Sequence, residues 1–541
     1  MTGRPGPRLL TAVRLITLAA VVVYGFGALA YVNRFPAVSQ DEPWIASSGY
    51  KLATEGTIGT DLFAGFHGME RHFFVQMPVY ALLEAVLFRA FGLGVIQMRA
   101  LSIVFGLAML CVVYAVGREI GGERLGSLAV ALMVVQRVTA ATEVRPIGIL
   151  LLDSARLNRY DIAVPVFGLA ALWIILRSAT RNGTSRFLLA GFLVGLSTLS
   201  HLYGAFWLPA AVAVVVVRDG WRPAARRHVA FLVAGFGAIC LPWIVWAAAN
   251  WPDYIAQMRT VSTRFDIVDP AFYLSNVFSG DGPISIAWLV HTLRALPLIR
   301  VGAWALSLGV AAAAVMLLWR GRARSNGESA LLVVAAIQLL LFVVLLRVKS
   351  VNYVIGLWPL GALLLAWLAL ELWDSRHVAL RALVVATVGA IVLEGGVSLA
   401  AAAREARRAS SYDWYERQIA GCIPTGSLVL GFQHYWIGLH GFPYRSWLLP
   451  LNMTNPAYQG QPVSLDTALK RINPRIVLMD RFARELFEQT ANVADAYHYL
   501  AVGFDTFRAQ RPLVPRCVVR DPIYGTMEIY ETQPASSEAT P

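Results

Sequence analysis

Long apolar runs recur along this chain from the N-terminus to about residue 402. Runs of about 17 or more apolar residues are long enough to cross the hydrocarbon core of a bilayer as helices. Charged residues make up 15% of the 541 residues, whereas an average soluble domain has about 25%. The sequence therefore predicts a polytopic α-helical membrane protein whose first helix is retained rather than removed as a signal peptide.

About eleven of these runs are expected to be transmembrane helices. They cover residues 9–32, 95–117, 124–142, 160–177, 186–202, 204–217, 229–249, 301–319, 329–347, 353–371 and 382–402. The apolar segment 78–94 is interrupted by Glu84 and Arg89, so it either crosses the membrane or lies along its interface.

The arginines decide between these two placements of 78–94. If this segment lies at the interface, the N-terminal arginines share one side of the membrane with every later arginine cluster, as the positive-inside rule requires. The clusters are Arg4/Arg8/Arg14, Arg118/Arg124, Arg177/Arg181/Arg186, Arg218/Arg222/Arg226/Arg227, Arg320/Arg322/Arg324 and Arg376/Arg381. We therefore expect a cytoplasmic N-terminus, with the loops 33–94 and 250–300 and all residues after 402 on the extracytoplasmic side.

After the membrane module of residues 1–402, the pattern changes to short apolar segments bounded by glycine and proline. Residues 480–500 have the spacing of an amphipathic helix. We expect an extracytoplasmic α/β domain over 403–532 and a disordered tail over 533–541. The expected strands are 426–432, 474–480, 517–521 and 526–532. Cys422 and Cys517 either form a disulfide in an exported domain or remain free.

The net charge of +13 does not indicate nucleic-acid binding. The arginines lie in short loops, where they set topology, and no motif combines basic and aromatic residues as nucleic-acid binders do. The cysteine spacing does not fit a zinc site.

The pair Asp41-Glu42 follows the first span in the stretch S-Q-D-E-P-W. Ionisable groups at a membrane usually face a cavity or a partner. Adjacent residues of a helix do not face each other, so the pair cannot act as a facing acid and base. One carboxylate can point into a cavity while the other binds elsewhere. A plain helix start is the alternative, because Pro43 suits a first helical turn.

Further polar side chains gather at the expected outer ends of the spans. They are Arg156, Arg159, Tyr160, Asp161, His201, Tyr203, Arg347, Lys349, Asn352 and Tyr353. Cations on the outer face suit a phosphate ligand. Alternatively, Arg347 and Lys349 snorkel to lipid headgroups, His201 is a packed bundle histidine, and Asp161 pairs with an arginine of A-R-L-N-R-Y-D.

The order of these motifs resembles a known family. A span, D-E, an extended loop, a Pro-led helix ending in F-G, then R-x-x-S and a second span are followed by an outer-end R-Y-D. H-x-x-G at 201–204 and K-x-x-x-Y at 349–353 complete the series. This looks like the bacterial branch of the protein O-mannosyltransferase and lipid A aminoarabinose transferase family, with the glycosyltransferase C fold. The similarity covers about residues 10–400.

The resemblance implies an inverting glycosyltransferase at the outer face of the bacterial cytoplasmic (inner) membrane. The donor would be a polyprenyl-phosphate sugar, and the acceptor a hydroxyl of a cell-envelope glycan, lipid or protein. Asp41 matches the general base, Glu42 a residue that positions acceptor or loop, and Asp161 the acidic residue that opens the fourth span. Lys349 and Tyr353 match the family's phosphate-side positions. We also expect Arg347, Arg159, His201 and Gln76 to bind substrate. The other expected contact is membrane lipid; nucleic acid is not expected.

One motif departs from the family. Aminoarabinose-type members usually carry E-K-P-P where this chain has Val75-Gln76-Met77-Pro78. The lysine that would contact phosphate is missing, and Arg71, His72 or Gln76 are candidates to replace it. No metal ligands are assigned, and the sequence neither requires nor excludes a divalent cation.

Two other functions compete with this hypothesis. A transporter or flippase of lipid-linked glycans should place polar residues near the bilayer midplane, whereas here they gather at outer ends. The W-P-D-Y at 251–254 is superficially similar to an oligosaccharyltransferase signature. It lacks the glycine and lies in a mid-chain loop, so we discount it.

Overall fold

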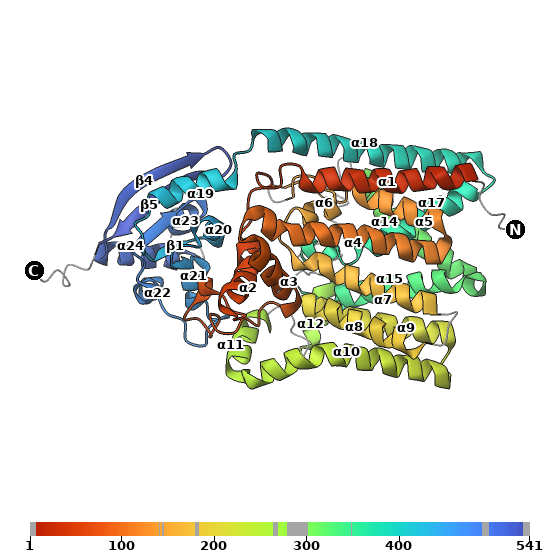
Figure 1. Ribbon diagram of the computed structural model, residues 1–541, viewed down its shortest axis with the longest axis horizontal. Coiled ribbons are helices and arrows are strands. Elements are labelled where there is room, and N and C mark those ends of the chain that lie inside the picture. Colours follow the sequence, from red (N-terminus) through yellow and green to blue (C-terminus); the bar gives the residue numbers. More distant parts are fainter. Residues whose placement is uncertain are drawn as a thin grey trace, which may run out of the picture.

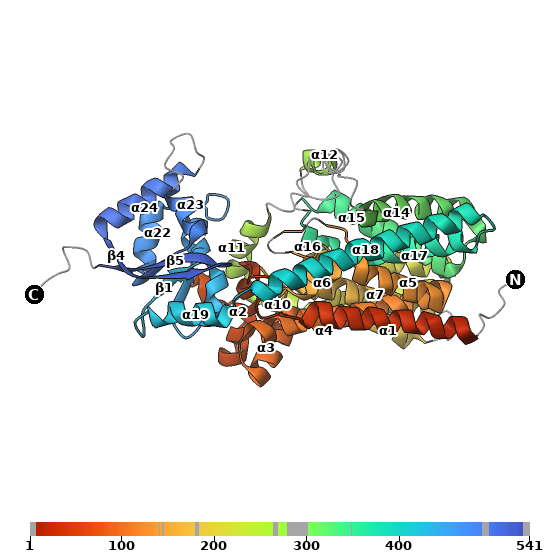
Figure 2. The same ribbon diagram turned by 90° about the horizontal axis from the view of Figure 1, so that it is seen from above.

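Two parts lie end to end along the long axis of the molecule: a bundle of long helices and a smaller α/β part (Figure 1). The computed structural model describes residues 7–139, 141–142, 145–178, 183–262, 269–278, 301–347, 349–488 and 497–533. Both views place the α/β part beyond the end of the bundle where α1 (Pro7–Leu29) ends (Figures 1 and 2).

Within the described residues, 8 helical segments are long and apolar enough to cross a membrane. The helices that form them are α1, α4 (Val95–Gly121), α7 (Ala163–Arg177), α9 (Trp207–Asp219), α10 (Pro223–Ala249), α14 (Val301–Arg320), α15 (Asn326–Leu345) and α18 (Val378–Arg408). The other three expected spans are shorter helices, namely α5 (Glu123–Val135), α8 (Thr184–Ser200) and α17 (Trp358–Asp374). Each predicted span therefore contains a helix, although α5 ends before the predicted end at 142 and α17 begins after the predicted start at 353. The helical membrane fold is confirmed.

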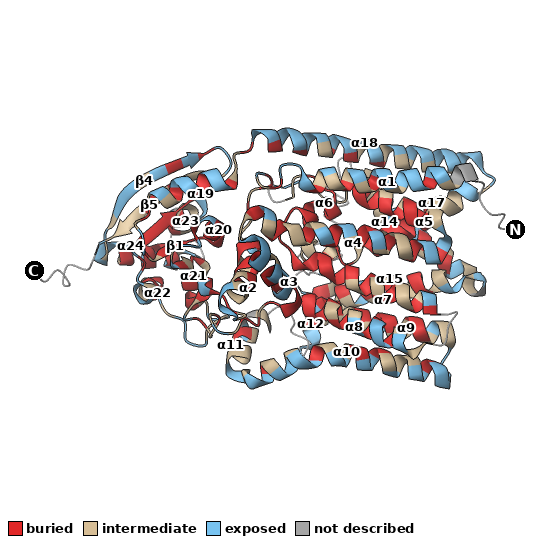
Figure 3. Cartoon of the chain, viewed as in Figure 1, coloured by how far each residue is buried: buried red, intermediate tan, exposed pale blue. Residues whose placement is uncertain are grey.

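The faces of the bundle helices follow their surroundings. Figure 3 shows buried residues where helices meet and exposed residues along the outer faces of α10 and α18. Several exposed side chains are large and apolar, such as Ile244 and Trp319. Large apolar side chains on the outside of a bundle are expected where lipid, not water, surrounds the helices.

The segments that join the spans at one end of the bundle fold into short helices. α2 (Asp41–Glu55) packs against α3 (Pro78–Phe91), and Figure 1 shows both beside the α/β part. α3 begins at Pro78, as its sequence suggests, and is not one of the candidate spans. The other short helices here are α6 (Leu150–Ala155), α11 (Trp251–Ser262), α12 (Pro270–Phe278) and α16 (Val351–Val354).

The α/β part, which extends from α19 (Tyr412–Gly421) to β5, holds a five-stranded sheet of order β2-β1-β3-β5-β4. β1 pairs in parallel with β2 and β3, and β5 pairs antiparallel with β3 and β4. The strands are β1 (Val429–Gly431), β2 (Tyr444–Ser446), β3 (Ile476–Met479), β4 (Leu513–Asp521) and β5 (Gly525–Thr532). The remaining helices are α20 (Trp436–Leu439), α21 (Leu448–Thr454), α22 (Leu465–Ile472), α23 (Arg481–Phe487) and α24 (His498–Gln510).

The predicted strands are confirmed, whereas the predicted helix over 480–500 is wrong. α23 ends at Phe487 and α24 begins at His498, while residues 489–496 lie outside the described residues. The short strand β2 was not expected. Domain boundaries near residues 403 and 533 stay predictions, and residues 534–541 of the expected tail are not described.

Two features hold the α/β part together and against the first loop. A disulfide joins Cys422, at the end of α19, to Cys517 in β4, with a Cα–Cα distance of 6.3 Å. Apolar side chains of the loop after α1, among them Phe63 and Phe73, share one hydrophobic cluster with Tyr435 and Leu449 of the α/β part. The first loop is thus packed between the two parts.

Candidate functional site at the junction of the two parts

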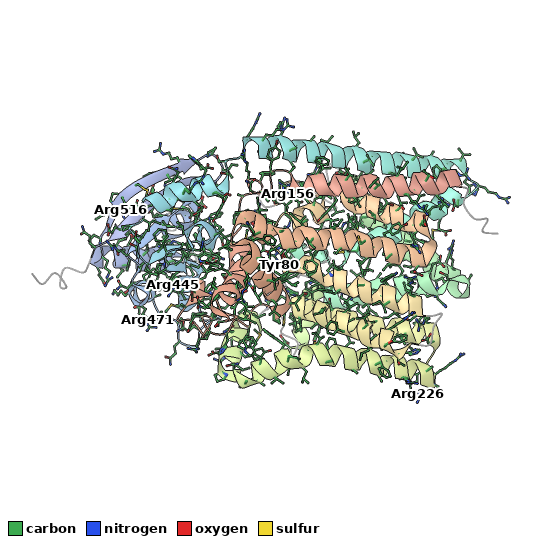
Figure 4. All side chains as sticks on the ribbon, in the orientation of Figure 1. Tyr80, Arg156, Arg226, Arg445, Arg471 and Arg516 are labelled. Carbon is green, nitrogen blue, oxygen red and sulfur yellow. A yellow bond between two sulfur atoms is a disulfide. The ribbon has the colours of Figure 1, made fainter. Side chains whose placement is uncertain are left out.

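A cavity of about 260 Å³ lies where the bundle, the first loop, α11 and the α/β part meet. Its described lining residues are Asp41, Trp44, Phe63, Met69, Phe73, Phe74, Val75, Gln76, Met77, Tyr160, His201, Leu202, Met258, Val261, Leu346, Arg347, Tyr353, Gln433, Leu448, Asn452 and Tyr458. Figure 4 shows Tyr80 and Arg156 at this end of the bundle and Arg226, from a predicted cytoplasmic cluster, at the opposite end.

The two adjacent carboxylates have different surroundings. Both lie in the first turn of α2, where a helix N-terminus favours negative charge. Asp41 lines the cavity, its side chain is 52% exposed, and it pairs with Arg159. The side chain of Glu42 is 0% exposed and does not reach the described cavity wall. The pair thus points in two directions, as helix geometry requires.

Glu42 is enclosed by hydrogen-bond donors. Arg99 donates from Nε to Oε1 at 2.7 Å and from Nη2 to Oε2 at 2.9 Å. The backbone N–H groups of Ser39 and Asn158 donate to the same carboxylate at 2.8 and 3.0 Å. Of the two roles that the resemblance gives Glu42, positioning the acceptor or the loop, these contacts fit the loop.

Arg159 joins Asp41 to Asp161. Its Nε donates to Asp161 Oδ2 at 2.9 Å, and its Nη1 donates to Asp41. Burial opposes the charge of Arg159, but Asp161 and Asp41 outweigh that effect and raise its pKa. Asp161 is itself buried and is not part of the described cavity wall. The alternative expectation, that Asp161 pairs with a nearby arginine, therefore describes its contact, and the partner is Arg159 rather than Arg156.

Arg156 anchors the bundle end instead. Its guanidinium donates to the carbonyl oxygens of Gly27 at 2.6 Å, of Ala30 at 2.8 Å and of Phe35. Burial and the charge of Arg99 lower the pKa of Arg156 to about 10. This side chain therefore holds the end of α1 and the segment that follows it in place.

The R-x-x-S motif explains how the charged groups are held. Arg99 and Ser102 are one helical turn apart on α4, so both face the same side. Arg99 holds Glu42, while Ser102 Oγ accepts from the backbone N–H of Arg159 at 3.0 Å. Ser102 also bonds Tyr80 at 2.8 Å, and Tyr80 donates to Asn158 Oδ1 at 2.9 Å.

The two expected phosphate-binding cations differ in position. Arg347 is exposed, lines the cavity and makes no hydrogen bond or ion pair with the other described residues. Lys349 is fully buried, outside the described wall, and donates to the carbonyl oxygen and Oδ1 of Asn276 at 2.8 and 2.7 Å. Burial lowers the pKa of Lys349 to about 8. The snorkelling alternative is wrong for Lys349, since its amine does not reach solvent.

His201, Tyr353 and Gln76 all line the cavity. The rings of His201 and Tyr353 lie 5.0 Å apart, centre to centre. Gln76 donates to the carbonyl oxygen of Trp44 at 3.2 Å and accepts from Ser48 at 3.3 Å. These bonds fix the amide at the cavity edge.

Of the three candidates to replace the missing lysine, only Gln76 lines the cavity. Arg71 and His72 instead contact Asp253, at 3.3 and 2.9 Å, and tie the first loop to α11. Asp253 belongs to the W-P-D-Y segment, so in this chain that segment contributes a structural contact.

Sequence reasoning missed the aromatic wall of Trp44, Phe63, Phe73 and Phe74, and the lining residues from the α/β part. Aromatic residues in an unpatterned loop gave no signal. Glu84 was noted only as an interruption of 78–94. It is fully buried, accepts from Asn158 Nδ2 at 2.6 Å, and burial raises its pKa to about 8.

Metal ligands do not gather in the part of the chain that the structure describes. No group of three or more His, Cys, Asp or Glu side chains there could hold an ion.

Sequence and structure comparisons agree on what the chain resembles. Residues 75–246 match the family described as dolichyl-phosphate-mannose-protein mannosyltransferase. A comparison with curated proteins gives no significant match.

Solved structures match over nearly the whole chain. ArnT from Cupriavidus metallidurans bound to undecaprenyl phosphate matches with a TM-score of 0.62 at 16% identity, covering 98% of this chain and 99% of that one. The archaeal oligosaccharyltransferase AglB from Archaeoglobus fulgidus, in complex with an inhibitory peptide and a dolichol-phosphate, matches with a TM-score of 0.52 at 13% identity, covering 96% and 75%. The chain thus has the glycosyltransferase C fold and is similar over residues 75–246 to the protein mannosyltransferase family, which confirms the expected resemblance.

Proposed function

We propose that this protein is a membrane glycosyltransferase that moves a monosaccharide from a polyprenyl-phosphate donor to an acceptor hydroxyl, with inversion. The family match and the fold support a lipid-linked sugar as donor. The observation that carries the proposal is the cavity at the bundle end. Among its described lining residues, Asp41 is the one carboxylate and Arg347 the one arginine or lysine.

Asp41 is the proposed general base. It takes the proton of the acceptor hydroxyl as that oxygen forms a bond to the anomeric carbon of the donor sugar. The bond between this carbon and the phosphate oxygen breaks on the opposite side, which inverts the configuration. Arg159 keeps the Asp41 carboxylate oriented through its bond to that side chain.

Arg347 is the proposed phosphate ligand. Polyprenyl phosphate leaves with its charge on oxygen, so a cation that stabilises the leaving group is more useful than a strong acid. Arg347 reaches the cavity, and a guanidinium can bind two phosphate oxygens at once. His201, Tyr353 and Gln76 would line the sugar and phosphate path. Lys349 would affect the site only indirectly, because its amine binds Asn276 and so positions α12.

The proposed site faces the extracytoplasmic side. The Cys422–Cys517 disulfide supports this, because disulfides persist in oxidising compartments. A cysteine placed at Ala323, in the short loop before α15, would test it. An impermeant thiol reagent should leave that cysteine unmodified in intact cells, and modification would overturn the orientation.

Purified protein in proteoliposomes can separate this function from that of a flippase. With a radiolabelled polyprenyl-phosphate sugar and envelope extract as acceptor source, we expect label in a new glycosylated product. Movement of the labelled lipid across the bilayer without any product would support the transporter instead. Boiled protein and Asp41→Asn protein serve as controls for product formation.

A further inference from the structure

The α/β part presents one particular edge of its sheet to the cavity. Gln433 lies two residues after the end of β1, and α21, which begins two residues after the end of β2, contributes Leu448 and Asn452 to the wall. β1 and β2 are parallel neighbours, so their carboxyl ends lie on the same edge. Ligands of open α/β sheets bind outside the carboxyl ends of parallel strands.

Polar groups at this edge retain hydrogen-bonding capacity. Ser446 donates to Oε1 of Gln433 at 2.5 Å, which leaves the amide nitrogen of Gln433 as a donor. The side-chain amide of Asn452 and the hydroxyl of Tyr458 make no hydrogen bond to the described residues, although both side chains line the cavity. The carbonyl of Tyr458 bonds His67 Nε2 at 2.9 Å, which fixes its turn to the first loop.

The charge is distributed unevenly around the cavity. Asp41, on the first loop, and Arg347, just after α15, are the described lining residues with a full charge, and neither belongs to the α/β part. The wall from the α/β part is neutral: Gln433, Leu448, Asn452 and Tyr458. A phosphate or carboxylate placed against this wall would lose water without gaining a cation, which is costly. The neutral wall therefore suits an uncharged group.

Aromatic rings favour a saccharide over a peptide as that group. Trp44, Phe73 and Phe74 line the same cavity as the neutral amides. Apolar rings and neutral hydrogen-bonding groups in one cavity suit a ligand with both C–H faces and hydroxyls. One common way for a peptide to bind a sheet is to add a strand to its edge. Here the free edge of β2 is covered by residues 61–63, and Arg445 donates to the carbonyl of Asp61 at 3.1 Å.

We propose that the carboxyl edge of β1 and β2 is the acceptor subsite, with Gln433, Asn452 and Tyr458 as its hydrogen-bonding residues, and that it takes an uncharged saccharide. This rests on the proposed function and narrows its acceptor to a glycan hydroxyl. The saccharide would be held by the α/β part with one hydroxyl directed to Asp41.

Saturation-transfer NMR on the full-length protein in detergent tests this subsite directly. The probes are neutral methyl glycosides of glucose, galactose, mannose and arabinose, with glucose 6-phosphate and a serine-containing tripeptide for comparison. We expect at least one neutral glycoside to bind. Asn452→Ala and Tyr458→Phe should each weaken that binding about three- to tenfold, the effect of losing one neutral hydrogen bond.

Tyr499→Phe is the matched control, because Tyr499 lies exposed on α24 and outside the described cavity wall. It should bind the glycoside as the wild type does. Equal glycoside binding by wild type and an Asn452→Ala/Tyr458→Phe double variant of unchanged melting temperature would overturn the subsite. If only the tripeptide or only the phosphorylated sugar bound, the assignment of an uncharged saccharide as the ligand would be overturned.

Retention of radiolabelled undecaprenyl phosphate separates this inference from the proposed function. If the protein retains that lipid but binds no glycoside, the acceptor subsite fails and the donor site stands. If a glycoside binds through Asn452 and Tyr458 but no sugar is ever transferred, the proposed reaction fails.

Discussion

The two sides of the cavity are built differently. The bundle side, which here includes the first loop, is a network of mostly buried charges, in which Arg99 binds Glu42 and Arg159 binds both Asp41 and Asp161. The described lining from the α/β part is neutral, and the side-chain amide of Asn452 and the hydroxyl of Tyr458 make no hydrogen bond to the described residues. Charge-assisted hydrogen bonds are strong and hold side chains in place. A general base needs such a fixed position to accept a proton. Neutral amides and hydroxyls suit recognition of an uncharged ligand.

The largest expected effect is on the folding of the bundle side. Removing one partner of a buried ion pair typically costs about 3–5 kcal/mol, because the other charge stays buried. Glu42→Gln should therefore lower the thermal unfolding midpoint in detergent substantially. Asp374→Asn is the control, since the Arg124–Asp374 pair is 3.0 Å long but exposed, and such pairs contribute about 0–1 kcal/mol. Similar melting of both variants would show that Glu42 is not a structural anchor.

A second effect is a pH dependence that Glu84 gives to the bundle side. Burial raises the pKa of Glu84 from 4.5 to about 8, so the folded state keeps a proton that the unfolded chain releases in between. The stabilisation is complete below pH 4.5 and is lost as the pH rises towards 8, at no more than about 1.4 kcal/mol per pH unit.

Glu84→Gln is neutral at every pH and should flatten that loss of stability. Denaturant unfolding of both proteins over this range measures the difference in slope. Asp153, whose pKa burial raises to about 7, contributes with the same sign in both proteins. An equal slope in wild type and Glu84→Gln would mean that Glu84 is already charged in the fold.

A smaller effect separates the two cations of the bundle side. Arg347→Ala should weaken retention of radiolabelled undecaprenyl phosphate about tenfold, because it removes a charged hydrogen-bond donor from the cavity. Lys349→Met should weaken lipid retention less, because the Lys349 amine donates to Asn276 and does not line the described cavity wall. A greater loss in Lys349→Met than in Arg347→Ala would return the phosphate site to the lysine.

The features that could be predicted from the sequence are those that depend on a local pattern of residues. The period of a helix alone separates Asp41 from Glu42, and Asp161 lies two residues from its partner Arg159. Apolar run length likewise identified each of the 8 described helical segments that are long and apolar enough to cross a membrane.

Contacts between distant segments could not be read from the sequence. Arg99 meets Glu42 across 57 positions and Lys349 meets Asn276 across 73. The neutral wall could not be predicted without the order of the strands in the sheet. β2 was not predicted, and it is this strand that places α21 at the cavity. The predicted helix over 480–500 was likewise wrong in its length: Asp480 caps the start of α23, and that helix ends at Phe487.

The central claim is that Asp41 alone acts as the base in a cavity shared by both parts. The most direct measurement is the single-turnover rate of sugar transfer by Asp41→Asn at saturating donor, in protein with wild-type melting and wild-type undecaprenyl phosphate retention. We predict a rate about 10²- to 10⁴-fold below wild type, the usual contribution of a general base. A rate equal to that of the wild type would contradict the account.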